Sequence, residues 1–175
     1  MGSIEKVIPD NGKLIGAVQE EADWQWISDG ITIDSGAAES VMPRELFSQY
    51  PVKENAQSKA GVYYVTASGE GIANEGEKQI RMTMMNGAEK DMTFQVTEVN
   101  KILGSVSKIC AKGHQVVFNP PGHRDGNFIL NLQTGDRMPL FEENGTYKLY
   151  GWVNPVNRHT NSLSRPTSTF QWPGM

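Results

Sequence analysis

The clearest candidate for chemistry is the segment ITIDSGA, residues 31–37. Its alternating β-branched residues predict a short buried strand, and that strand ends at a carboxylate, Asp34. Gly36 permits a sharp turn there, and the hydroxyl of Ser35 can hydrogen-bond the backbone of the turn. An Asp-Ser-Gly triplet on its own is more often a simple strand-to-loop turn, so the surrounding sequence has to decide.

Other reactive residues form weaker patterns. Cys110 and His114 lie near each other in the sequence, with His123 and His159 further on. Structural zinc sites usually contain a Cys-x-x-Cys or His-x-x-x-His pair, and neither is present, so we expect no metal. A Cys–His nucleophile pair is disfavoured because Cys110 is predicted to be a core residue. The glycines of segment 69–76 lack the Gly-Lys-Ser/Thr ending of a phosphate loop, and we expect no cofactor.

Short strands dominate the elements that must position Asp34. Alternating or β-branched runs bounded by turn residues predict these strands, and Asn86-Gly87 is the strongest hairpin signal among the turns. The predicted strands are 24–27, 31–33, 62–66, 79–85, 91–99, 115–118, 127–132, 138–141 and 147–153.

Helices are few in this prediction. Residues 44–49 are interpreted as a short helix after Pro43, and the polar segment 53–59 as a loop. Apolar residues at helical spacing predict a second helix over 102–110, stopped by Gly113. Many short strands and little helix predict an all-β barrel or sandwich.

The chain is interpreted as one domain with two flanking segments. Residues 22–153 hold the periodic pattern, and a single domain of this size can bury a core. Residues 1–21 are weakly patterned and are predicted to be a flexible leader. Residues 154–175 are rich in Pro, Ser, Thr and Asn and are predicted to be a flexible tail.

Charge and composition exclude several classes of partner. The 16 basic and 20 acidic residues give a net charge of −4 without any basic run, so nucleic-acid binding is not expected. No apolar run approaches the ~20 residues that span a bilayer, so no membrane association is expected. The single Cys110 fits a reducing compartment, and we expect a cytoplasmic protein.

Three features in order resemble the retropepsin family of aspartic proteases, and in particular the protease segments of copia-type retroelement polyproteins. The Asp-Ser-Gly-Ala segment comes first, a glycine-containing hairpin tip follows, and two apolar residues with a glycine then precede a helix. The resemblance covers roughly residues 24–153. The matching segments are DSGA at 34–37, ASG at 67–69, LGSVSKI at 103–109, GHQVVF at 113–118 and GTYKL at 145–149.

This resemblance implies a fold and a set of roles. The fold would be a closed retropepsin-like β-barrel with one short helix. Asp34 would be the catalytic acid, Ser35 would hydrogen-bond across a dimer, and Gly36 and Ala37 would leave space for substrate. A flap that closes over the substrate would be formed by Ala67, Ser68, Gly69, Glu70 and Gly71, and the second family motif by Ile102, Leu103 and Gly104.

The chemistry of the family requires two carboxylates that share one proton. The sequence contains one Asp-Ser/Thr-Gly triplet. A homodimer, active about a two-fold axis, would therefore supply the Asp34 pair and cleave an extended peptide, such as a retroelement polyprotein, with an activated water. A virus-like particle in the cytoplasm is a compatible setting. The alternative is an inactive module of the same fold that binds peptides or assembles a polyprotein.

Overall fold

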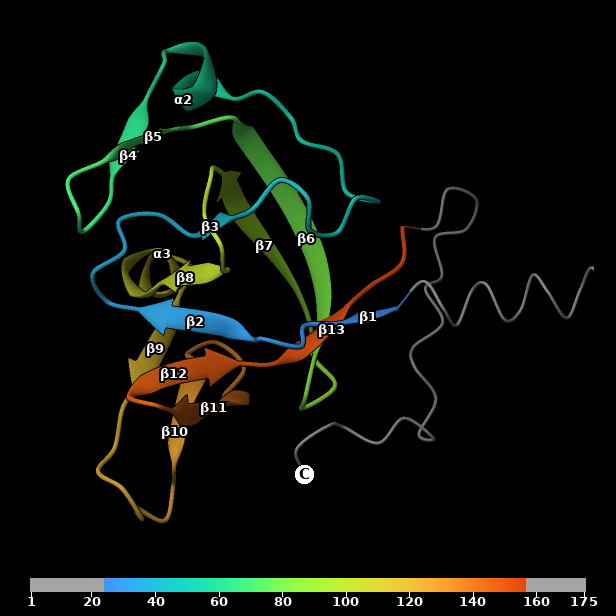
Figure 1. The fold of residues 1–175 in the computed structure, drawn as a ribbon. Coiled ribbons are helices and arrows are strands. Elements are labelled where there is room, and N and C mark those ends of the chain that lie inside the picture. Colours follow the sequence, from blue (N-terminus) through green and yellow to red (C-terminus); the bar gives the residue numbers. More distant parts are fainter. Residues whose placement is uncertain (1–23, 157–175) are drawn as a thin grey trace, which may run out of the picture.

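The computed structural model describes residues 24–156. Strands make up 44% of the structure and helices 8%, which confirms the prediction of a mostly β protein. Figure 1 shows a strongly curled sheet with a small hairpin at one end. The predicted leader and the part of the predicted tail beyond residue 156 lie outside the described residues.

One curled sheet of 11 strands forms the body of the domain. Its strands follow the spatial order β1-β13-β6-β7-β3-β8-β2-β12-β11-β10-β9. Within residues 24–156 the two ends of this order, β1 and β9, pair with one neighbour each, so this part of the chain forms a half-barrel and not the closed barrel that we predicted. The strands are β1 (Gln25–Trp26), β2 (Ile31–Asp34), β3 (Val41–Met42), β6 (Gly76–Met84), β7 (Glu89–Val96), β8 (Leu103–Ser105), β9 (His114–Val117), β10 (Asn127–Asn131), β11 (Arg137–Glu143), β12 (Thr146–Leu149) and β13 (Gly151–Val153).

Most turn signals of the sequence produced the expected hairpins. β6 and β7 pair antiparallel around the Asn86-Gly87 turn, where Gly87 has a φ of 81°. A second small sheet pairs β4 (Tyr63–Val65) with β5 (Gly71–Ala73), as the predicted hairpin requires. The alternation of the long strands buries their apolar residues, and isoleucine and methionine side chains make up much of the core.

The predicted helix at 102–110 begins later than expected. Residues 103–105 form strand β8 instead, and helix α3 (Val106–Ala111) follows directly. Parallel pairing with β2 on one side and contact with β3 on the other explain the strand, because these tertiary hydrogen bonds outweigh the helical spacing. The helix ends at Ala111, and Gly113, with a φ of 85°, follows its C-cap Lys112 as the predicted stop.

The predicted helix at 44–49 is wrong, since this segment consists of turns. The amine of Lys78, on β6, enters the segment and donates hydrogen bonds to the carbonyl oxygens of Arg44 at 2.7 Å and Leu46 at 2.8 Å. Phe47 has a φ of 55°, which no α-helix accommodates. Burial lowers the pKa of Lys78, and the two carbonyl bonds compensate for its loss of water.

The predicted loop at 53–59 contains a helix that we did not expect. Helix α2 (Ala56–Lys59) begins after Asn55, whose side chain accepts a hydrogen bond from the Ser58 N–H while the Ser58 hydroxyl accepts one from the Asn55 N–H. This capping box explains how so short and polar a helix forms. It lies at the base of the β4–β5 hairpin (Figure 1).

The packed structure continues past residue 153. Asn154 is fully buried, and its N–H donates to the carbonyl oxygen of Arg81 at 2.9 Å. Its side-chain oxygen accepts a hydrogen bond from the Thr83 hydroxyl at 2.9 Å. No helix among residues 24–156 is long and apolar enough to cross a membrane.

Candidate functional site

Asp34 occupies the last position of β2, where the strand leaves the sheet. The buried side chains of Ile31 and Ile33 anchor the strand from below, and the carboxylate itself is half-buried. Its Oδ1 atom accepts a hydrogen bond from the Gly36 N–H at 2.8 Å. The turn therefore holds one carboxylate oxygen in place and leaves the other available.

Strand β8 holds the Asp34 turn from the side. β2 and β8 run parallel, with Asp34 opposite Ser105. Ser105 is completely buried; its hydroxyl donates to the Ala37 carbonyl oxygen at 2.7 Å, and its N–H donates to the Ser40 hydroxyl at 3.0 Å. These bonds hold the loop 35–40 at Ala37 and at its last residue, Ser40.

Gly104 allows β8 to approach β2 this closely. A Cβ atom at this position would lie 2.9 Å from Ile33 Cδ1 and 3.1 Å from Ile31 Cγ2, so only hydrogen fits without displacement. Of the other residues of the predicted second motif, Ile102 is buried in the core and Leu103 is half-buried. The structure thus brings the segments 31–34 and 102–105, distant in the sequence, into direct contact.

The other predicted residues of the Asp34 loop have different environments. Ser35 and Gly36 are exposed, and Ala37 is half-buried. Exposure of Ser35 leaves its hydroxyl accessible, and its bond across a dimer stays a prediction. Below, the term junction refers to β2, β8 and the loop 35–40 together.

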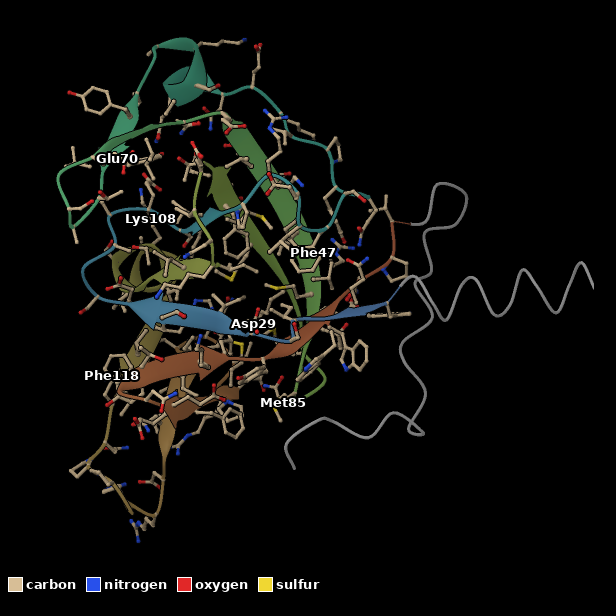
Figure 2. All side chains as sticks on the ribbon, viewed as in Figure 1. Asp29, Phe47, Glu70, Met85, Lys108 and Phe118 are labelled. Atoms are coloured by element: carbon tan, nitrogen blue, oxygen red, sulfur yellow. The ribbon has the colours of Figure 1, made fainter. Side chains whose placement is uncertain are left out.

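The predicted flap residues form the exposed tip of the β4–β5 hairpin. Thr66 starts the turn: its N–H donates to the Glu70 carbonyl oxygen at 2.8 Å, and its carbonyl oxygen accepts from the Gly69 N–H at 2.9 Å. Gly69 has a φ of 85°, and a Cβ atom added there would meet nothing within 4 Å, so the tip is surrounded by open space at this point. Figures 1 and 2 show the tip, with Glu70, on the same side of the view as the loop that follows β2.

A polar network connects the base of this hairpin to the sheet. Its centre is Asn74, whose side-chain amide donates to Gln95 Oε1 at 2.8 Å and to the Tyr64 hydroxyl oxygen at 2.8 Å. Tyr64 donates in turn to Gln57 Oε1 at 2.8 Å. Burial raises the pKa of Tyr64, and the hydrogen bond from Asn74 opposes this shift.

Glu39 extends this network to the junction. Its Oε1 atom lies 2.9 Å from the Lys108 amine on α3 and accepts a hydrogen bond from Gln57 Nε2 at 3.5 Å. Glu39 therefore contacts both α3, which follows β8, and α2, which lies at the base of the β4–β5 hairpin. No periodic signal in the sequence predicts this contact, because its three members come from separate turns and helices.

Cys110 was predicted to be a core residue, and this prediction is wrong. Val106 and Ile109 are the residues of α3 that pack against the core, whereas Cys110 follows Ile109 by one position and is exposed. Neighbouring residues of a helix point in different directions, which explains the outcome. Among residues 24–156 no group of three or more His, Cys, Asp or Glu side chains is placed to hold a metal ion.

A cavity among the described residues borders the junction at Glu39 and Ser40. It has a volume of about 930 Å³, runs along β7, and is bordered on the other side by α3 and by the strands β9 to β11. Sequence reasoning missed it because its walls combine several elements without a common spacing. Asp34 does not line it.

Comparisons of the chain with family models, with curated proteins and with solved structures found no match.

Proposed function

We propose that this protein is an aspartic endopeptidase of the retropepsin type. The single observation that carries the proposal is the junction, in which a half-buried carboxylate ends a buried strand and is held by a glycine N–H. The parallel neighbour strand with Gly104 and Ser105 stiffens this turn. A fixed carboxylate with one oxygen available suits proton transfer to a reacting water.

The second carboxylate comes from a second copy of the chain. Two Asp34 side chains that meet at a two-fold axis cannot both ionise, so they share one proton. The ionised member then takes a proton from the attacking water, and the protonated member donates to the carbonyl oxygen of the scissile bond. Exposure of residues 35 and 36 leaves this side of the loop available to a partner.

The β4–β5 hairpin covers the substrate in this proposal. Its side chains Tyr63 and Val65 are each 67% exposed and, two positions apart on β4, lie on the same face of the strand, which suits contact with an extended peptide. A substrate in β conformation would place alternate side chains toward the hairpin and toward the junction. Polyproteins offer such extended segments between their domains, and a cytoplasmic location would bring enzyme and substrate together.

The direct test compares cleavage of a peptide library by the parent and by Asp34→Asn. We expect the substitution to reduce the rate by at least about 10²- to 10⁴-fold, because it removes the proton-transferring group. Asp29→Asn is the matched control, since Asp29 is an exposed aspartate in the turn before β2 and should leave cleavage unchanged. Equal cleavage by parent and Asp34→Asn, or none by either, would reject the proposal.

The dimer is tested separately by sedimentation equilibrium. We expect cleavage per subunit to increase with protein concentration over the same range in which the dimer forms. A monomer at every concentration, together with peptide binding but no cleavage, would support the inactive binding module instead.

A further inference from the structure

The cavity along β7 is a groove with an apolar floor. Five of its lining residues are buried in the core, so the floor is part of the folded body and not a loop that could move away. Its volume of about 930 Å³ is in the range of ligand-binding clefts. The buried floor residues are Met82, Met84, Ile129, Met138 and Leu149.

One wall of the groove is a strand with an open edge. β7 pairs with β6 along its whole length, but it pairs with β3 only at Gln95 and Val96. The N–H of Gln95 donates to the Ser40 carbonyl oxygen, so it points away from β6. Backbone direction alternates along a strand, and therefore the N–H and C=O groups of Thr93 and Asp91 also point away from β6. Neither residue has a strand partner on that side among residues 24–156.

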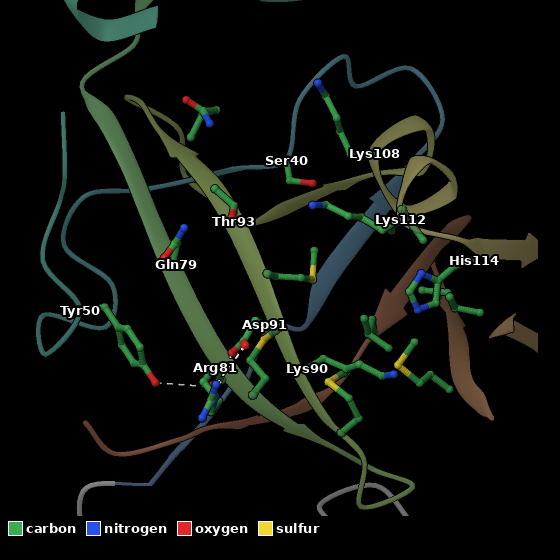
Figure 3. A pocket seen from close by; sticks show the side chains of 18 of the residues that line it. Ser40, Tyr50, Gln79, Arg81, Lys90, Asp91, Thr93, Lys108, Lys112 and His114 are labelled. Atoms are coloured by element: carbon green, nitrogen blue, oxygen red, sulfur yellow. Dashed lines mark hydrogen bonds and ion pairs between the residues drawn. The ribbon is translucent and has the colours of Figure 1, made fainter. Parts of the chain in front are cut away.

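The charges around the groove are uneven. Arg81 and Lys108 are in ion pairs with carboxylates. Lys90 and Lys112 have no ion-pair partner among the described residues, and both line the groove. Figure 3 shows Lys90 reaching from β7 into the groove and Lys112 reaching from the end of α3 toward β7.

A third polar group lacks a partner at the same place. The Nδ1 atom of His114 is buried and has no hydrogen-bond partner within the described part of the chain. His114 also lines the groove, close to Lys112 in the sequence and on the side opposite β7 (Figure 3). A buried nitrogen of this kind costs free energy unless a hydrogen-bonding group pairs with it, and a ligand in the groove can supply one.

From these observations we propose that the groove binds one extended acidic peptide strand from a partner protein. The backbone of that strand extends the sheet at the edge of β7 beside Asp91 and Thr93. Its apolar side chains cover the methionine floor, and its carboxylates pair with Lys90 and Lys112. The open edge favours a peptide over a compact small molecule, because only a peptide backbone pairs with a row of N–H and C=O groups.

Asp34 does not line the groove, although Glu39 and Ser40 of the junction do, so the site is tested by binding and not by cleavage. The test therefore uses the Asp34→Asn chain throughout, which prevents cleavage of the probe. The probe is a fluorescein-labelled Glu-Val-Glu-Val-Glu-Val-Glu peptide, compared by fluorescence anisotropy with the same peptide carrying Lys in place of Glu. We expect the acidic probe to bind at least tenfold more tightly, and equal or reversed affinities would overturn the proposal.

Charge reversal locates the site. Lys90→Glu with Lys112→Glu should weaken binding of the acidic probe at least tenfold. The control, Lys59→Glu with Lys101→Glu, introduces the same charge at two exposed lysines outside the groove and should change the affinity less than twofold. Equal losses in the two double variants would overturn the proposal, because they would indicate a general charge effect.

Loss of one backbone donor tests the open edge. Thr93→Pro removes an N–H that faces the groove, and we expect at least a tenfold loss of affinity. Thr93→Val keeps the N–H and should bind as the parent does, and thermal unfolding verifies that both variants fold. If Thr93→Pro binds normally, or if the substitutions dissociate a dimer without affecting the probe, the edge is not a peptide site and the proposal fails.

Discussion

The junction and the β4–β5 hairpin are held in opposite ways. At the junction Ser105 is 0% exposed, and its N–H and hydroxyl bond the Ser40 hydroxyl and the Ala37 carbonyl oxygen of the loop 35–40. The hairpin has exposed side chains along both strands, and its fixed point is the polar network around Asn74 at its base. One region is held by a buried residue and the paired strands beside it, the other by a few hydrogen bonds at one end.

The difference separates two mechanical requirements. A carboxylate that transfers protons has to stay within a fraction of an ångström of its position, which close packing provides. A cover over a peptide has to open and close, which a hairpin anchored only at its base permits. Glu39 contacts both regions, so a change at one has a direct route to the other.

The largest expected effect comes from Gly104→Val at the junction. The first added carbon already lies 2.9 Å from Ile33 Cδ1 and 3.1 Å from Ile31 Cγ2, so a valine side chain overpacks the space between β2 and β8 and displaces these isoleucines. We expect a loss of about 3 kcal/mol in the free energy of unfolding, measured in urea. Gly104→Ala should lower the free energy of unfolding by less. Parent-like stability of the valine variant would show that the junction is not closely packed.

Ser105→Ala should have the next largest effect on stability. The substitution leaves the partly buried Ala37 carbonyl oxygen without its donor, and we expect a loss of about 2 kcal/mol in the free energy of unfolding. Ser107→Ala is the control, since Ser107 is exposed and its hydroxyl bonds the Ser105 hydroxyl instead of a backbone group of the loop. If the two variants unfold at the same urea concentration, Ser105 does not fix the loop.

Asn74→Ala tests the hairpin base. It removes the hydrogen bonds to Gln95 and Tyr64, and we expect the free energy of global unfolding to fall by only about 1 kcal/mol. Amide exchange should instead accelerate strongly in 63–73 and stay unchanged in 31–34. Uniform acceleration in both segments would contradict the separation between the two regions.

The smallest effect is a pH dependence confined to the hairpin. Burial raises the pKa of Tyr64 above 10.0, so the folded state keeps a phenol proton that the open state loses. The closed hairpin therefore becomes less stable as the pH rises above 10.0. Methyl NMR signals of Val65 and Ile72 should shift in this range while those of Ile33 do not, and Tyr64→Phe should abolish the shift. A parent-like titration in Tyr64→Phe would assign it to another group.

Local signals of the sequence predicted much of this structure. The Asn86-Gly87 turn favours positive φ values, and it produced the expected hairpin. The alternation of Ile31 and Ile33 predicted a buried strand that ends at Asp34. Each of these signals involves residues that are close together in the sequence, and such local relations can be recognised from the sequence alone.

Most of the failures involve partners distant in the sequence. Residues 44–46 are turns because Lys78 binds their carbonyl oxygens from another strand. Residues 103–105 are a strand because β2 and β3 lie beside them. Helix α2 is an exception, since Asn55 and Ser58 form a capping box that was present in the sequence and was interpreted as loop polarity.

Because Cys110 is exposed on α3, it can carry a spectroscopic label. It is the single cysteine of the 175 residues and is exposed, so a thiol-reactive nitroxide will attach at this one position without any substitution. α3 follows β8 directly, and a label there moves with the junction. In a symmetric pair of chains, pulsed electron paramagnetic resonance would then give one narrow separation between two spins, and a lone chain would give none.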